Sequence, residues 1–175
     1  MAHTLILGIG NTLLSDDGAG IHALREMQHR VAGRSDVELI DGGTLSFTLL
    51  PAIETAQNLI VLDATQLNAE PGTVQCFQGR ELDVLLTRPR RSVHEVSLLD
   101  LFGSARLVGT LPERRALIGV QPASLEWGEH PSPAVAAAIP WMVDIALECL
   151  ASWTERAEEP RFRGREGANV VGGRS

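Results

Sequence analysis

The chain has 175 residues, of which 44% are hydrophobic and 21% charged, and its formal net charge is −7 at pH 7. This length and composition predict one globular domain with a full core. The negative charge disfavours a nucleic-acid partner, because it repels phosphates. The two cysteines, Cys76 and Cys149, are far apart and form no CxxC motif, so we expect a reduced, cytoplasmic protein. We also expect a monomer.

The two ends of the chain differ in composition. The first residues lead into an apolar run with no basic region or cleavage site, so we expect no signal peptide. The longest apolar stretches are expected to fall short of a membrane span. Residues 154–175 are rich in Arg, Glu and Gly, and such a segment cannot bury enough surface to offset its ordering entropy. We therefore expect a single domain over residues 1–153 and a disordered tail over residues 154–175.

Apolar runs and helical patterns alternate along the chain. Short apolar runs predict strands over Thr4–Gly10, Val37–Asp41, Asn58–Asp63, Thr73–Gln78 and Arg115–Val120. Apolar residues at helical spacing predict helices over Gly18–Val31, Thr44–Ala56, Ser92–Leu107 and Ala134–Trp153. Gly79–Arg91 fits either a short helical turn or a loop. The alternation predicts the α/β class, with about five mostly parallel strands in one sheet and helices on both faces.

Local signals refine the predicted helices. Pro51 is expected to make the second helix irregular. Ser92 and Glu95 have the spacing of a capping box at the start of the third helix. Asp16 is interpreted as a cap of the first helix, so its loss would cost about 1 kcal/mol of stability and leave activity intact. Asp17 could cap the same helix or face a ligand, because the helix dipole favours a carboxylate in either role.

The main functional signal is the stretch Leu5–Gly20, LILGIGNTLLSDDGAG. It joins a buried strand to a helix through a glycine turn and two carboxylates. A second apolar run, LIVLDA, ends at Asp63. Because the carboxyl ends of parallel strands meet at one edge of a sheet, we expect Asp17 and Asp63 to lie together there. The alternative for Asp63 is a carboxylate bonded to neighbouring loop amides.

His94 is the third candidate residue. It lies in the first turn of a predicted helix, where the dipole disfavours the imidazolium and keeps the ring neutral, the state that a metal ligand needs. The alternative is an exposed polar residue at a helix start. Two carboxylates and one imidazole suit a divalent transition metal, and three protein ligands leave room for water or a substrate atom.

Two other classes of site are disfavoured. A dinucleotide-binding turn needs Gly-x-Gly-x-x-Gly, but Gly8 and Gly10 are followed by Leu13 at the third position. Asp41 does occupy the place of a ribose-binding acid, yet the two carboxylates of the first motif would repel a pyrophosphate. A serine nucleophile elbow is absent from the sequence, and both cysteines fall within predicted strands or helices as packing residues.

Five motifs in order resemble the hydrogenase maturation proteases, over roughly residues 4–150. GIGNTLLSDDGAG resembles the opening motif of that family, in which the second acidic residue is usually Glu and here is Asp17. IDGGT (residues 40–44) is similar to the second motif. LIVLDA and SVHEVSLLDLF supply the family's metal-binding residues at Asp63 and His94. GVQPASLEWGEHPSPAV (Gly119–Val135) is similar to the last motif.

The resemblance implies a three-layer α/β/α sandwich and an endopeptidase, grouped with the aspartic-type peptidases although the sequence has no Asp-Thr/Ser-Gly pair. The implied substrate is the large-subunit precursor of a nickel–iron hydrogenase, cut once after nickel insertion to remove a C-terminal extension. Asp17, Asp63 and His94 are then the expected catalytic and metal-binding residues. The nickel belongs to the substrate, and another divalent cation could take its place.

The positions of two further stretches suggest how the substrate is held. Asp41, Gly42 and Gly43 are expected to bind it, and the loop Gln121–Pro133 to form a second wall. Because both stretches follow predicted strands, they should border the site, and Gly permits a close backbone approach. A nickel-sensing chaperone that holds the precursor without cutting it would use the same three ligands, so the sequence leaves both functions open.

Overall fold

The computed structural model describes residues 3–44, 47–88 and 93–158. Its single sheet contains β1 (Thr4–Ile9), β2 (Val37–Gly43), β3 (Asn58–Ala64), β4 (Val74–Gln78) and β5 (Arg114–Val120). The strand order is β2-β1-β3-β5-β4, and every neighbouring pair is parallel except β4 with β5. The expected sheet of five mostly parallel strands is confirmed.

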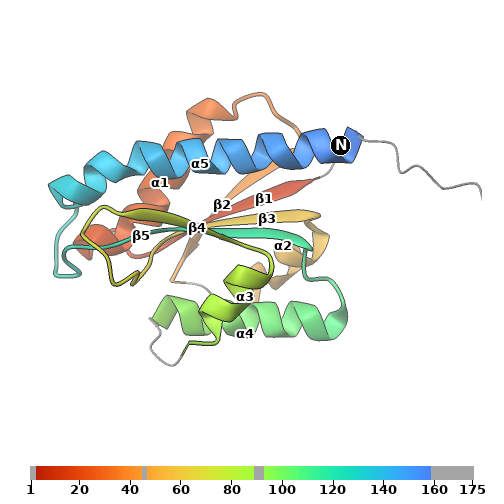
Figure 1. Cartoon of the computed structure of the whole chain (residues 1–175), viewed down its shortest axis with the longest axis horizontal. Coiled ribbons are helices and arrows are strands. Elements are labelled where there is room, and N and C mark those ends of the chain that lie inside the picture. Colours follow the sequence, from red (N-terminus) through yellow and green to blue (C-terminus); the bar gives the residue numbers. More distant parts are fainter. Residues whose placement is uncertain (1–2, 45–46, 89–92, 159–175) are drawn as a thin grey trace, which may run out of the picture.

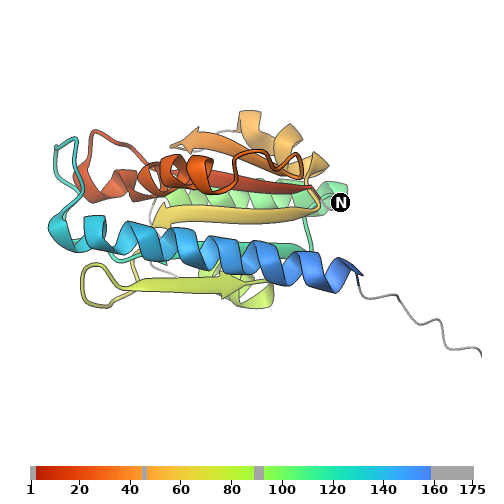
Figure 2. The ribbon, with the colours of Figure 1, turned by 90° about the horizontal axis from the view of Figure 1, so that it is seen from above.

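The helices form two layers, one on each face of the sheet (Figures 1 and 2). One face is covered by α1 (Ala19–Arg30) and α5 (Pro133–Glu158). The other is covered by α2 (Leu50–Thr55), α3 (Arg80–Leu86) and α4 (Val93–Val108). The expected three-layer α/β/α sandwich is therefore confirmed.

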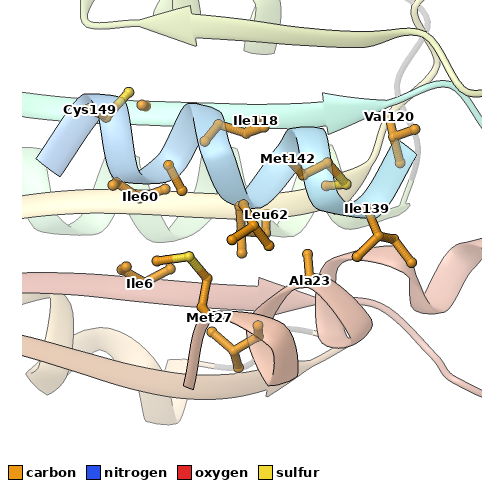
Figure 3. Close-up of a cluster of buried hydrophobic side chains, with 14 of the residues drawn as sticks. Ile6, Ala23, Met27, Ile60, Leu62, Ile118, Val120, Ile139, Met142 and Cys149 are labelled. Carbon is orange, nitrogen blue, oxygen red and sulfur yellow. The ribbon is translucent and has the colours of Figure 1, made fainter. Parts of the chain in front are cut away.

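Both faces of the central strands are buried, which explains their continuous apolar sequence. Figure 3 shows Ile6, Ile60 and Ile118 of three strands beneath Met27 of α1 and Met142 of α5. The alternate residues of the same strands enter the opposite core with the side chains of α2, α3 and α4. Burying one such aliphatic side chain stabilises the fold by about 1.5–3 kcal/mol. A strand with only one buried face would instead alternate apolar and polar residues.

The topology creates the position of the site. From β1 the chain passes to β2 on one side, and β3 lies on the other side of β1. The connections that leave the carboxyl ends of β1 and β3 therefore diverge, and such a switch point in an open α/β sheet is where ligands bind.

Some predicted elements differ in extent. The expected helix Thr44–Ala56 is a short 3-10 turn, Phe47–Leu49, followed by α2. Pro51 lies in the first turn of α2, where backbone N–H groups have no acceptor within the helix. Its missing N–H therefore costs no hydrogen bond, and Pro51 starts the helix instead of distorting it. The open segment after β4 contains the helix α3. The capping box at Ser92 and the tail beyond residue 158 lie outside the described residues.

The last helix, α5, is longer and more apolar than expected. It extends past Trp153 to Glu158, and its segment Pro133–Thr154 has a mean hydropathy of 1.7, enough by length and composition to cross a membrane. The expectation that every apolar stretch is too short for a span is therefore wrong. The expected inner stripe of this helix is buried against the sheet, namely Ile139, Val143, Ala146 and Leu150. Core packing explains this stripe, whereas only 39% of the apolar window is buried and Trp141 on the same helix is 66% exposed.

Candidate functional site at the carboxyl ends of β1 and β3

The turn after β1 places Asp17. Gly10 has a φ of +136°, and a Cβ there would clash with the carbonyl oxygen of Asp17, so only glycine allows the turn to fold back this closely. The backbone N–H of Asn11 donates to Oδ2 of Asp17 at 2.9 Å. The glycine and this hydrogen bond together fix a carboxylate next to the end of β1.

Neither aspartate of this turn caps a helix. Residues Ser15–Gly18 form a 3-10 turn, and α1 begins after it with Gly18 as its N-cap and no side-chain cap bond. The interpretation of Asp16 as a helix cap is therefore wrong. The extra turn separates both carboxylates from the first amides of α1, so the two carboxylates accept hydrogen bonds from other parts of the chain.

Asp63 lies near the end of β3 and is 1% exposed. Burial raises the pKa of Asp63 to about 6, although the hydrogen bond and the charge interaction with His94 oppose this rise and the Asp17 carboxylate adds to it. A buried carboxyl group that titrates close to neutral pH can hold or release a proton during a reaction.

His94 connects the two carboxylates. It lies in the first turn of α4, at the sheet edge where β1 and β3 end, and is 7% exposed. Its Nδ1 is 3.2 Å from Oδ1 of Asp63, and its Nε2 is 3.6 Å from Oδ2 of Asp17. A neutral imidazole carries one N–H, so it can donate to only one of the two carboxylates. The alternative of an exposed polar residue at the helix start is wrong for His94.

The structure thus brings Asp17, Asp63 and His94 together, with the ring between the carboxylates. In this arrangement each ring nitrogen faces a carboxylate oxygen, and no three His, Cys, Asp or Glu side chains within the described ranges are arranged to hold a metal ion. The donor set, two oxygens and one nitrogen, suits a divalent transition metal. To bind one with all three side chains, the ring must leave at least one of its carboxylate contacts.

Asp16 performs a role that the sequence analysis missed. Its side chain is fully buried and accepts four hydrogen bonds from the loop after β5: from the backbone N–H of Ala123 at 2.8 Å, Ser124 at 3.0 Å and Ser132 at 2.6 Å, and from the Ser132 hydroxyl at 2.9 Å. Burial alone would raise the pKa of Asp16, but these hydrogen bonds together lower it below its usual value.

Further bonds join the same two segments. Ser15 donates its N–H to the Gly128 carbonyl at 2.7 Å and its hydroxyl to the Glu126 carbonyl at 2.9 Å. The N–H of Gly128 donates to the Leu13 carbonyl at 3.0 Å. Figure 2 shows the loop that leads into α5, in cyan, beside the red turn after β1. The turn and the loop Gln121–Pro133 therefore form one bonded unit that borders the site.

The third expected stretch lies at the same sheet edge. β2 continues through Gly42 and Gly43 instead of stopping before them, and a bulge pairs Gly43 with Ile9. Gly43 donates its N–H to the Asp41 carboxylate at 3.0 Å and accepts from the Gly10 N–H at 2.8 Å. The Asp41 motif is thus attached to the same glycine turn that positions Asp17.

Sequence comparisons identify related proteins. A family model described as hydrogenase maturation protease matches residues 21–149. The hydrogenase expression/formation protein HupD of Rhodobacter capsulatus is 37% identical over 150 residues, which are 85% of this chain and 71% of the relative. The hydrogenase 2 maturation protease of Escherichia coli K12 is 35% identical over 146 residues, which are 82% of this chain and 85% of the relative.

Solved structures agree with these relatives. The hydrogenase maturating endopeptidase HybD of E. coli matches with a TM-score of 0.81 and 32% identity, over 86% of this chain and 93% of that one. The [NiFe] hydrogenase maturation protease HybD of Thermococcus kodakarensis matches with a TM-score of 0.71 and 26% identity, over 83% and 97% of the two chains.

Proposed function

The chain belongs to the hydrogenase maturation protease family, and from this premise we propose that it removes the C-terminal extension of a nickel–iron hydrogenase large-subunit precursor after nickel insertion. As a member of this family it is a hydrolase of the endopeptidase type. The observation that carries the proposal is the cluster of Asp17, His94 and Asp63 at the switch point of the sheet. Peptide hydrolysis needs groups that bind an electrophilic metal ion and groups that move a proton, and this cluster contains both kinds.

Nickel in the precursor is the proposed recognition element. Two carboxylates in a mostly buried site attract a divalent cation, whereas a metal-free precursor would bring no positive charge to them. Asp17, Asp63 and His94 would contact the ion after the ring leaves one of its carboxylate contacts. The ion could then polarise the scissile carbonyl as a Lewis acid.

The neighbouring stretches would hold the peptide. We propose that Asp41, Gly42 and Gly43 bind the substrate backbone or the basic residue before the cut, because Asp41 is exposed and carries a negative charge beside the site. The protein is further proposed to act in the cytoplasm, where Cys76 and Cys149 would stay reduced.

A cleavage assay tests the proposal. The purified protein should shorten a nickel-loaded precursor by one C-terminal fragment, detected by mass spectrometry. Asp17→Ala, Asp63→Ala and His94→Ala should each reduce the rate at least about 100-fold, as expected for groups that stabilise the transition state. Asp100→Ala is the matched control, since it removes an exposed carboxylate from the same helix as His94. Binding of the precursor without cleavage would indicate the chaperone function instead.

Nickel-gated recognition has a separate test. The same precursor is presented with and without nickel, and the initial cleavage rates are compared. We expect cleavage of the loaded precursor only. Equal rates would show that the peptide sequence, and not the metal, is recognised.

A further inference from the structure

Three large apolar side chains are exposed on the bonded unit beside the site. Leu13 is 50% exposed, Leu125 54% and Trp127 82%. Leu13 belongs to the turn after β1, and the other two belong to the loop after β5. Such exposure is unusual for Trp, because burying this large side chain contributes much free energy. We call these three residues the apolar patch.

The backbone brings the members of the patch together. Leu14 and Gly128 form an isolated parallel β-bridge. Since parallel pairing advances both chains in the same direction, the preceding residues, Leu13 and Trp127, are also neighbours across this bridge. Leu125 precedes Trp127 by two residues, in a segment anchored by the bond from the Ser15 hydroxyl to the Glu126 carbonyl.

The patch is held in place before any partner arrives. The buried Asp16 carboxylate accepts four hydrogen bonds from residues that flank Leu125 and Trp127 in the loop. Hydrogen bonds to an ionised group are stronger than neutral ones, so the loop is fixed against the turn. A surface that is already ordered loses less entropy on binding.

The patch is also continuous with the candidate site. Asn11 donates its N–H to the Asp17 carboxylate at 2.9 Å, and its own side-chain oxygen accepts the N–H of Leu13 at 3.0 Å. One residue therefore connects an exposed member of the patch to a carboxylate of the catalytic cluster. A protein bound to the patch would therefore place the segments next to its contact surface at the candidate site.

We propose that Leu13, Leu125 and Trp127 form the surface on which the folded body of the precursor docks, so that its C-terminal extension enters the adjacent site. This inference rests on the proposed function. The loop also exposes two acidic side chains, Glu126 and Glu129, close in sequence to Leu125 and Trp127. An apolar centre with an acidic rim is complementary to an apolar spot with basic residues around it, and tryptophan is enriched among the residues that dominate binding energy.

Steady-state cleavage of nickel-loaded precursor tests the patch. Trp127→Ala and Leu125→Ala should each raise KM about tenfold or more and change kcat less than about twofold, because the patch contacts the body of the substrate and not the reacting bond. The matched controls are Trp141→Ala, on the helix α5, and Leu107→Ala, at the far end of α4; both side chains are exposed. An unchanged KM in Trp127→Ala would overturn the inference.

A binding measurement separates this inference from the proposed function. In the double variant Trp141→Phe, Trp153→Phe, Trp127 is the only tryptophan. Its fluorescence should shift to the blue, and its quenching by acrylamide should fall, when precursor is added. Cleavage without either change would overturn the docking surface and leave the proteolytic function standing. Both changes without cleavage would support docking and count against the proteolytic function.

Discussion

Two adjacent carboxylates, Asp16 and Asp17, have opposite surroundings. Asp17 faces the imidazole of His94, whereas Asp16 is buried and bonded to the loop after β5. In a 3-10 turn successive side chains point in different directions, so neighbours in sequence can serve separate purposes. Asp17 is available for chemistry, and Asp16 fixes the loop that forms the wall beside it.

Asp16→Ala should therefore destabilise the protein by about 2–4 kcal/mol, because the variant leaves several buried donors without an acceptor. Cleavage should also slow, since the loop would no longer be fixed beside the site. Urea unfolding measures the first effect and the cleavage assay the second. The Asp100→Ala control should change stability by less than about 0.5 kcal/mol. A loss of only about 1 kcal/mol with full activity would show that the Asp16 hydrogen bonds do not fix the loop beside the site.

The pKa shifts of two aspartates predict opposite pH dependences. The pKa of Asp16 is lowered in the folded protein, so its stabilising contribution is present above the usual pKa and is lost as the pH falls through the lowered one. The pKa of Asp63 is raised to about 6, so the protonated folded form is favoured and stability is lost as the pH rises through this value.

Asp63→Asn should thus be more stable than the parent at pH 7.5, by at most about 3 kcal/mol for a shift of this size. The difference should disappear as the pH approaches about 4, where the carboxyl group is protonated in both states. Thermal or urea unfolding at several pH values measures it. A difference that does not change with pH would show that burial of the charge is not its cause.

At the scale of elements, α1 packs with its backbone directly against the sheet. A Cβ on Gly20 would clash with the backbone carbonyl oxygens of Ile9 and Leu62, so the first turn of α1 lies directly against β1 and β3. This contact keeps the turn that carries Asp17 close to the end of β3. The position of the site therefore depends on a residue without a side chain.

Gly20→Ala should lower the free energy of unfolding by about 3 kcal/mol or more, since backbone atoms must move to admit the methyl group. Gly103→Ala is the matched control: this residue lies in α4, is exposed, and has no atom within 4 Å of the added Cβ. The control should be stabilised by up to about 1 kcal/mol through helix propensity. Equal melting temperatures in the two variants would contradict the close packing.

Much of the fold could be predicted because two local patterns specify it. Strands buried on both faces have continuous apolar sequences, so the predicted strand Asn58–Asp63 matches β3 to within one residue. The meeting of Asp17 and Asp63 followed from parallel strands alone. The Asp16 bonds could not be predicted, because their partners lie 107 to 116 residues away and carry no pattern of their own. The apolar patch could not be predicted either, because Leu13 lies far in sequence from Leu125 and Trp127.

At the scale of the whole molecule, charge becomes important. The chain carries a formal net charge of −7, and the site concentrates two of its carboxylates near an exposed Asp41. A precursor with basic residues around its processing site would be attracted over distances longer than a hydrogen bond. Such attraction mainly accelerates association and leaves the chemical step unchanged.

Raising the salt concentration from about 0.02 M to about 0.3 M should lower kcat/KM several-fold, because the screening length falls from about 20 Å to below 8 Å. The value of kcat at saturating precursor should change little. Initial rates across a salt series measure both quantities. A constant kcat/KM would show that the acidic surface does not guide the precursor.

The order of the strands also sets the order in which the nascent protein can fold. β4 pairs with β5 alone, although α3 and α4 separate the two strands along the chain. The hydrogen bond from Ser132 to Asp16 likewise cannot form until Ser132, 116 residues later, has emerged from the ribosome. A nascent chain that ends before residue 123 lacks the partners that fix its first turn. Proteolytic competence therefore requires that the chain has been made through Ser132, so that the loop after β5 can close on the turn after β1.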